Sequence, residues 1–224
     1  MSISRRSFLS SAAMAAAARH VRAESVPQAL PAQQRGEFDP WLEIDAAALA
    51  HNVATLTRLS GGRPIIAVVK NNAYGCGITT VGSILDRLAG VAGLAAVRPE
   101  EARALRKAGV RKPVLLMGPA SDDESLELAR LDVRLAPYQL SERDRLTRLA
   151  RRLGRPVRVH VYVDTGMHRM GMPHDRVLAW LDDAQLRRAI TVDGAFTELT
   201  EDQDFDREQA KRLSTLAAAH GGSG

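Results

Sequence analysis

The sequence predicts an α/β fold in which parallel strands alternate with helices. Six short runs rich in Val, Ile and Leu lie along the chain, and polar, helix-like stretches separate them. The runs lack a clean two-residue alternation, which is typical of parallel strands that are covered on both faces. Six β-α units favour a TIM-type barrel, which needs eight strands to close, but six strands could also form a doubly wound open sheet. The local pattern alone leaves these two architectures open.

The elements follow from the order of the apolar and polar stretches. The predicted strands are residues 64–69, 93–97, 113–117, 133–136, 157–163 and 190–199. The predicted helices are residues 49–59, 81–88, 99–108, 122–129, 141–152, 175–182 and 205–219.

Residues that favour the first turn of a helix occur where several of these helices are predicted to begin. Pro99 suits the first turn of its helix, where the missing N–H is not needed. Either Ser121 or Asp122 can cap the helix that follows. Ser141 with Asp144 three residues later resembles a capping box, although Asp replaces the usual Glu.

Charge and composition bound the class of protein. The 224 residues suit one large domain or two small ones, and the hydrophobic fraction of 45% allows a sizeable core. The isoelectric point of about 9.9 invites a nucleic-acid partner. However, four of the 31 basic residues lie in residues 1–23, which contain no acid, so the other 27 nearly balance the 26 acidic residues. The chain also lacks a basic stretch studded with aromatic residues, and we therefore expect no nucleic-acid partner.

Residues 1–23 read as a twin-arginine signal peptide. Arg5 and Arg6 precede an alanine-rich apolar stretch at 8–18, and small residues at Val21 and Ala23 suit a cleavage site. The stretch is too short to span a membrane, so we expect no membrane anchor. An ordinary amphipathic helix is the alternative. The prediction is a periplasmic or otherwise exported protein.

Two further features have no predicted catalytic role. Residues 24–40 are rich in Pro and Gln, which predicts a linker. Cys76 is the single cysteine, so it excludes an intramolecular disulfide and argues against a zinc-thiolate cluster. Its place between Gly75 and Gly77 predicts a packed turn.

Lys70 is the strongest candidate catalytic residue. The chain has 27 Arg and only four Lys, and Lys70 alone ends a β-branched apolar run and opens a Gly-rich turn. An amine can be desolvated, lose its proton and attack an aldehyde, which a guanidinium cannot do. The alternative is a strand-end lysine that extends its ammonium into solvent.

Three segments of the chain, one of which contains Lys70, resemble segments of the alanine racemase family. Residues 67–75, AVVKNNAYG, resemble the pyridoxal-phosphate lysine motif of that family. Residues 41–45, WLEID, resemble its entry segment, and residues 163–171, VDTGMHRMG, its second signature. The three occur in the family's order, and the resemblance covers the chain from about residue 41 to its end.

The resemblance implies a fold and a set of site residues. It favours an incomplete (β/α)8 barrel at residues 41–224, the N-terminal domain of a fold-type III pyridoxal-phosphate enzyme. Lys70 would bind pyridoxal 5'-phosphate as a Schiff base and act as one of two bases. Tyr74 would contact the phosphate region through its hydroxyl, and Arg169 would approach the phenolic oxygen of the cofactor and the substrate carboxylate. A tyrosine packed on the turn and a surface arginine are the alternatives. Asp164 would orient the second loop by accepting backbone hydrogen bonds.

Three positions depart from the family pattern. Tyr162 stands seven residues before Arg169, where many members carry a carbamylated lysine. Its hydroxyl could bond Arg169 but cannot supply the same negative charge. Glu198 replaces a histidine that stacks on the cofactor ring, so the ring must be held differently. Cys76 replaces the common histidine of the lysine turn.

The predicted function is a pyridoxal-phosphate-dependent racemase of alanine or of a broader set of amino acids, with a small-molecule substrate. The alternatives are a cofactor-binding barrel without turnover, a fold-type III decarboxylase or aldolase, and a barrel without cofactor. In the family the opposite base is a tyrosine from a C-terminal β-domain of the partner in a homodimer. We find no such domain in the sequence and expect a fragment that is inactive alone, with a homodimer in the full-length form.

The predicted signal peptide at residues 1–23 allows a test of export. Replacing Arg5 and Arg6 together with lysine keeps the charge but removes the twin-arginine pattern, so the precursor should accumulate inside the cell. Cell fractionation and immunoblotting measure the distribution, with the paired change of Arg19 and Arg22 to lysine as the control. Undiminished appearance of the double variant in the periplasm would reject this route.

Overall fold

The computed structural model describes residues 41–221. The predicted signal peptide at 1–23 and the linker at 24–40 lie outside the described residues. The predictions for them therefore stay predictions.

Six parallel strands and one very short strand form the sheet. The strands are β1 (Ile65–Val68), β2 (Val91–Ala96), β3 (Val114–Leu116), β4 (Val133–Leu135), β5 (Val157–Asp164), β6 (Met172–Pro173) and β7 (Ile190–Phe196). Neighbours pair in the order β1-β2-β3-β4-β5-β7, every pair is parallel, and β6 adds a two-residue ladder to the end of β5. Strands that follow each other in the chain therefore lie side by side, as in a barrel.

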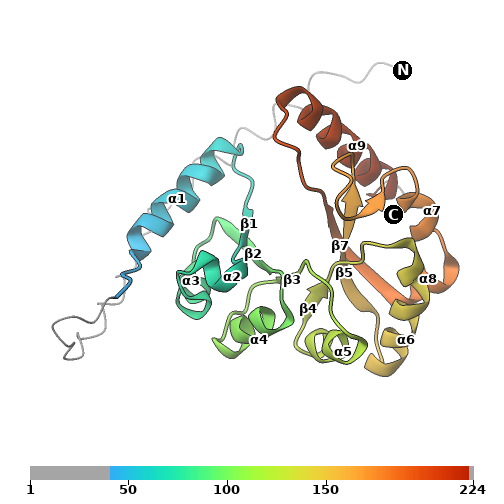
Figure 1. Ribbon diagram of the computed structural model, residues 1–224, viewed down its shortest axis with the longest axis horizontal. Coiled ribbons are helices and arrows are strands. Elements are labelled where there is room, and N and C mark those ends of the chain that lie inside the picture. The colour runs from blue at the N-terminus through green and yellow to red at the C-terminus, as the bar shows by residue number, and fades with distance from the viewer. Residues whose placement is uncertain (1–40, 222–224) are drawn as a thin grey trace, which may run out of the picture. The chain divides into compact units, whose positions relative to one another are not determined.

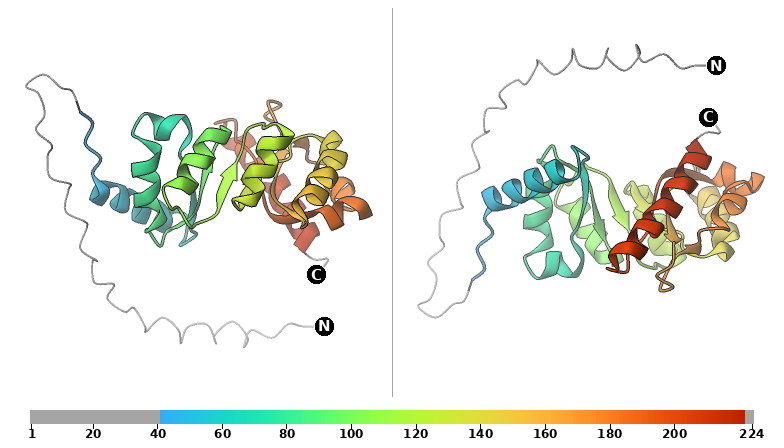
Figure 2. Two further views of the ribbon diagram at one scale, coloured as in Figure 1. Left: turned by 90° about the horizontal axis from the view of Figure 1, so that it is seen from below. Right: turned by 90° about the horizontal axis from the view of Figure 1, so that it is seen from above.

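Helices precede, connect and follow these strands. They are α1 (Ala46–Leu59), α2 (Lys70–Tyr74), α3 (Ile78–Asp86), α4 (Pro99–Lys107), α5 (Asp122–Arg130), the 3-10 helix η3 (Leu140–Glu142), α6 (Arg143–Leu153), α7 (Val177–Leu181), α8 (Ala184–Ala189) and α9 (Gln203–Gly221). Helices α3 to α6 lie side by side along the outer face of the sheet (Figures 1 and 2). A doubly wound sheet would carry such helices on both faces, so the structure selects the partial barrel. None of the helices within residues 41–221 combines the length and the apolar run that crossing a bilayer requires.

The main core lies between the sheet and these helices. Leu94 and Leu116 point outward from β2 and β3, and Leu105, Leu128 and Leu146 come from α4, α5 and α6; each is at most 1% exposed. Burial of these leucines removes apolar surface from water, which is the main force that holds helices on the sheet.

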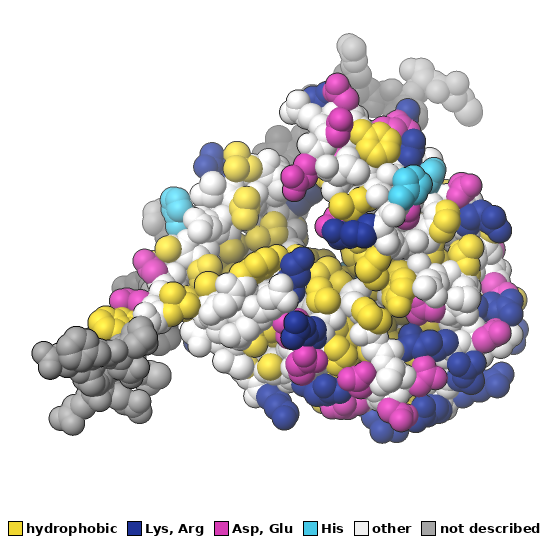
Figure 3. All heavy atoms as spheres, viewed as in Figure 1, with side chains coloured by type: hydrophobic (Ala, Val, Ile, Leu, Met, Phe, Trp, Pro, Cys, Tyr) yellow, Lys and Arg dark blue, Asp and Glu magenta, His cyan; other side chains and the backbone are white. Residues whose placement is uncertain are grey.

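Fewer buried side chains lie on the inner face of the sheet than on its outer face. Ala95, Leu115 and Ala136 form a small buried cluster there. On β1, Ile66 and Val68 remain 44% and 41% exposed, and within the described residues β1 pairs with β2 alone. Figure 3 shows hydrophobic side chains gathered along this hollow side. The sheet thus has an open edge and an apolar inner face, as expected for a partial barrel.

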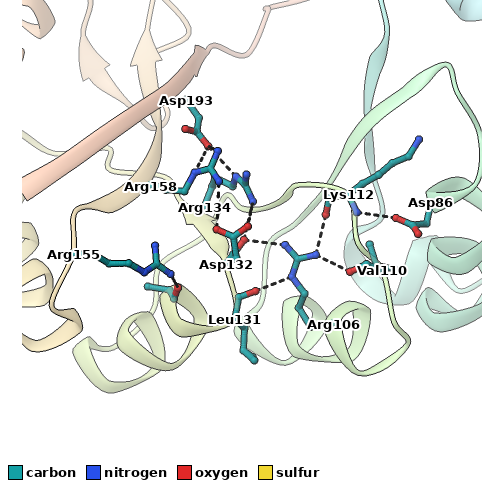
Figure 4. Close-up of polar contacts among 11 residues, drawn as sticks. Asp86, Arg106, Val110, Lys112, Leu131, Asp132, Arg134, Arg155, Arg158 and Asp193 are labelled. Carbon is teal, nitrogen blue, oxygen red and sulfur yellow. Dashed lines mark hydrogen bonds and ion pairs between the residues drawn. The ribbon is translucent and has the colours of Figure 1, made fainter.

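An ion-pair network joins three strands toward their amino ends (Figure 4). The Arg134 side chain is only 6% exposed, and it pairs with Asp193 and Asp132, each at 2.9 Å. Arg158 also reaches Asp193, at 2.8 Å. A buried guanidinium is costly unless it is fully paired, so this network fixes how β4, β5 and β7 align.

The helix caps confirm one prediction and correct another. Ser121 caps α5 by accepting a hydrogen bond of 3.3 Å from the backbone N–H three residues later. The capping box of Ser141 and Asp144 is wrong. Glu142 takes the role instead, because its carboxylate accepts from the backbone N–H groups of residues 138 and 139 at 3.0 and 3.2 Å.

The end of the last strand and one short helix also differ from the prediction. The last strand ends at Phe196 rather than at residue 199, because the backbone then turns toward α9. Helix α8 was not predicted, since its six residues are shorter than the pattern that identifies a helix. Its start could have been found from Asp183, whose carboxylate accepts from the N–H groups of Gln185 and Leu186.

The core generates a stability prediction. Leu105→Ala removes a fully buried side chain that packs against Gly82 of α3, and it should lower the free energy of unfolding by about 2–5 kcal/mol. Leu59→Ala changes a leucine that is 71% exposed and should cost no more than about 0.5 kcal/mol. Urea denaturation of both variants measures the difference; equal losses would contradict the assigned core.

Candidate functional site

The predicted site residues follow the carboxyl ends of two strands. Lys70 and Tyr74 begin and end α2, directly after β1, and Arg169 lies in the loop after β5. The carboxyl ends of parallel strands lie along one edge of a sheet, where the sites of barrel enzymes are built. Lys70 and Arg169 therefore share this edge, with β2, β3 and β4 between their strands.

The turn that follows Lys70 has an unusual backbone. Asn71, Asn72, Ala73 and Tyr74 all have φ between 53° and 56°, which is the left-handed helical region. Residues with a Cβ adopt this region at a cost of about 1–2 kcal/mol each. The predicted turn at 71–77 is thus one left-handed helical turn, and the surrounding structure must stabilise it.

Glu101 of α4 provides part of that stabilisation. Its side chain is buried, with 7% of the residue exposed, and it accepts hydrogen bonds from the N–H groups of Asn72, Val97 and Arg98 at 3.1–3.2 Å. Burial alone would raise the pKa of Glu101, but these N–H donors outweigh it and lower the pKa below its usual value. Sequence reasoning missed Glu101, although its place two residues after Pro99, at the third position of a helix, is a capping signal.

The rest of the turn is held locally. The Asn72 side chain accepts a hydrogen bond of 2.9 Å from the Ile78 N–H, and Gly75 ends the turn with φ 90°. Cys76 is half-buried and packs against the main core, which confirms the predicted packed turn. Tyr74 is 64% exposed and so is not packed on the turn. Within the described part of the chain, Lys70 Nζ makes no hydrogen bond or ion pair, which leaves this amine available to a ligand.

The Arg169 loop is folded tightly over the end of β5. Asp164 accepts hydrogen bonds from the N–H groups of Gly166 and His168 at 2.9 and 3.0 Å, as predicted. Burial would raise the pKa of Asp164, but the N–H donors lower it. Gly171 has φ 114°, and a Cβ there would lie 2.6 Å from the Asp164 nitrogen, so only glycine fits.

Arg169 lies in a small polar group of three residues. Its Nη2 forms an ion pair with Glu198 Oε2, and the same oxygen accepts a hydrogen bond of 3.0 Å from the Tyr162 hydroxyl. The expected direct bond from Tyr162 to Arg169 is therefore replaced by one through Glu198. The Tyr162 ring stacks on Phe196 with centroids 4.4 Å apart.

Helix α9 fixes the backbone around this group. Gln209 is fully buried and donates to the Thr165 hydroxyl and the Glu198 carbonyl, both at 3.1 Å. It also accepts from the Thr200 N–H at 3.1 Å. Arg212 donates to the Thr165 carbonyl at 2.7 Å. The loops that carry Arg169 and Glu198 are thus tied to one helix.

The structure brings the predicted residues into two groups rather than one. Lys70 and Tyr74 share the left-handed turn, and Arg169 joins Glu198 and Tyr162. No hydrogen bond or ion pair of residues 41–221 connects the two groups. The same residues contain no cluster of three or more His, Cys, Asp or Glu suited to a metal ion. An unpaired amine, a phenol and a guanidinium along one edge suit an anionic ligand that carries an aldehyde.

Comparisons of sequence identify the relatives. The family model "Alanine racemase, N-terminal domain" matches residues 44–222. An alanine racemase of Nitrosococcus oceani is 43% identical over 135 residues, which is 60% of this chain and 36% of the relative. One of Syntrophobacter fumaroxidans is 36% identical over 168 residues, 75% of this chain and 44% of the relative. The chain thus spans less than half the length of these curated relatives.

Solved structures agree on the fold. The alanine racemase of a D-cycloserine-producing Streptomyces lavendulae matches with a TM-score of 0.71 and 26% identity, over 81% of this chain and 49% of that one. An alanine racemase of Clostridium difficile in complex with cycloserine matches with a TM-score of 0.65 over 79% of this chain and 49% of that one, but at 23% identity it supports the fold alone.

The Glu101 contacts generate a pH-dependent prediction. Glu101→Gln should lower the free energy of unfolding at pH 7 by about 1–3 kcal/mol, because it replaces a buried acceptor. The folded pKa of Glu101 is lowered, so its contribution is present above the unfolded pKa of about 4.3 and is lost as the pH falls through the folded pKa. The difference in the free energy of unfolding between wild type and Glu101→Gln should therefore shrink as the pH falls.

Denaturant titrations from neutral to acid pH measure this gap. The matched control is Glu100→Gln on the same helix, whose side chain is 63% exposed and whose change should cost no more than about 0.5 kcal/mol. A gap between wild type and Glu101→Gln that stays constant across the range would contradict the assigned role.

Proposed function

This chain belongs to the alanine racemase family through its N-terminal domain, and we propose that it is the barrel part of a pyridoxal-phosphate-dependent racemase of alanine or of a broader set of amino acids. The observation that carries the proposal is the Lys70 amine, unpaired within the described residues and set in a left-handed turn at the carboxyl end of β1. The strain of that turn suits a functional site, because such backbone persists only where neighbours enforce it.

The residues present fit pyridoxal phosphate. Its aldehyde needs a primary amine without a competing partner, and Lys70 Nζ meets this condition. Its anionic oxygens need hydrogen-bond donors and cations, which the Tyr74 hydroxyl and the Arg169 guanidinium would supply. When bound, the cofactor would accept electron density from the substrate Cα and so weaken the Cα–H bond.

Lys70 and Arg169 would have different roles in the reaction. The Lys70 amine would remove or return the Cα proton on one face of the substrate. The half-exposed Arg169 would orient the substrate carboxylate. The matched relatives do not favour a cofactor carrier, a decarboxylase or an aldolase, since they are alanine racemases.

We further propose that the protein is exported and that its full-length form is a homodimer. The twin-arginine pattern at Arg5 and Arg6 supports export of the protein. A homodimer of the full-length form is supported by the family resemblance.

The cofactor lysine is tested by chemical labelling. After incubation with pyridoxal phosphate and reduction with borohydride, peptide mapping should find the label on Lys70, and Lys70→Arg should abolish it. Lys107, Lys112 and Lys211 serve as internal controls; the Lys112 amine already donates to the Leu88 and Val91 carbonyls. A label on these residues without one on Lys70 would refute the assignment. For the reaction itself, deuterium exchange at Cα of L- and D-alanine is measured on a form that includes the expected C-terminal domain, because the chain alone is expected to be inactive. Exchange that persists there in Lys70→Arg would contradict the role of Lys70 as a base.

A further inference from the structure

Glu198 joins Arg169 to Tyr162 through one carboxylate oxygen. From this contact we infer that Glu198 is a positioning residue, which supplies the negative charge that orients the Arg169 guanidinium, while Tyr162 orients the carboxylate. The inference rests on the proposed function only in treating Arg169 as a ligand of the cofactor and the substrate. The contact itself stands on the structure.

Tyr162 is a rigid anchor for the carboxylate. It lies in β5 opposite Phe196 of β7, is 5% exposed, and stacks its ring on Phe196. Its hydroxyl therefore has little freedom, and it donates to Glu198 Oε2 at 3.0 Å. A hydrogen bond to an ionised acceptor is about twice as strong as one between neutral groups, so it selects one orientation of the carboxylate.

The backbone of Glu198 is fixed from a second direction. Its carbonyl accepts from the buried Gln209, and the hydroxyl of the preceding Thr197 lies 2.7 Å from that of Thr165 in the Arg169 loop. The Glu198 backbone is thus held through its carbonyl and through the preceding residue, although the Glu198 side chain is 42% exposed.

The ion pair acts on orientation rather than on stability. The Arg169 side chain is 53% exposed, and exposed ion pairs contribute little to the free energy of unfolding. A long arginine side chain without a partner samples many rotamers, whereas a fixed carboxylate limits it to a few. The two departures from the family pattern therefore compensate each other: Tyr162 carries no charge, and Glu198 supplies one from the loop that follows the adjacent strand β7.

Chemical modification of arginine tests the contact without the cofactor. In the 224-residue chain, Glu198→Gln should raise the rate at which phenylglyoxal modifies Arg169, read by peptide mass spectrometry, by about two- to fivefold. Glu201→Gln is the matched control, since it removes the same charge from an exposed residue three positions away and should leave the Arg169 rate unchanged. Arg207, paired with Asp204 at 2.8 Å, is the internal standard.

A second variant separates charge from hydrogen bonding. Tyr162→Phe keeps the ring on Phe196 and removes only the hydroxyl, so it should raise the Arg169 rate by less than Glu198→Gln does. The thermal midpoint of Glu198→Gln should match that of Glu201→Gln, which shows that the fold is intact. Equal Arg169 rates in wild type and Glu198→Gln, or equal increases in Glu198→Gln and Glu201→Gln, would overturn the inference.

A spectroscopic readout tests the effect on the cofactor site. With pyridoxal phosphate at saturation, the pH midpoint of its visible band should fall by about half to one unit in Glu198→Gln, because removal of a nearby negative charge favours the less protonated form. Glu201→Gln should not shift it. An unchanged midpoint in Glu198→Gln would show that Glu198 does not act on the cofactor. If wild type takes no label at Lys70, the proposed function fails, while the Arg169 rates still decide the role of Glu198.

Discussion

The packing of helices against the outer face of a parallel sheet in chain order is the constraint on which the site depends. Leu105, Leu128 and Leu146 are buried against the strands, so each β-α unit must take the same direction as its neighbour. Every strand consequently ends at the same edge. The Lys70 turn and the Arg169 loop reach that edge from units far apart in the chain, and nothing in their own residues would place them there.

Each half of the site is held by a residue from another element. Glu101, which opens α4, accepts from the backbone of the Lys70 turn and offsets part of the cost of its left-handed conformation. Gln209 of α9 bonds the loops after β5 and β7 together. The candidate side chains lie in short segments after the strands, but their supports are buried polar groups on helices. Rigid positioning therefore comes from the scaffold, even though the loops are exposed.

The sequence predicted the elements that depend on local pattern. The apolar runs located the six main strands, and the strand-end position of Lys70 singled it out among four lysines. The contacts that support the candidate site could not be predicted, because they join residues far apart in the sequence. Glu101 meets Asn72 from 29 residues away, and Glu198 meets Tyr162 from 36 residues away. No propensity or periodicity encodes such pairs. The left-handed turn at Asn71 to Tyr74 was also missed, and part of its support comes from Glu101 on another helix.

The Arg169 group shows why residue-by-residue comparison can mislead. Position by position, Tyr162 lacks the charge expected beside Arg169, and Glu198 lacks the ring expected over the cofactor. In space, β5 and β7 are neighbours, with Tyr162 paired to Phe196 two residues before Glu198. A carboxylate on β5 or in the loop directly after β7 can therefore reach the same guanidinium. The register of β5 and β7 thus allows the negative charge beside Arg169 to come from a different segment of the chain.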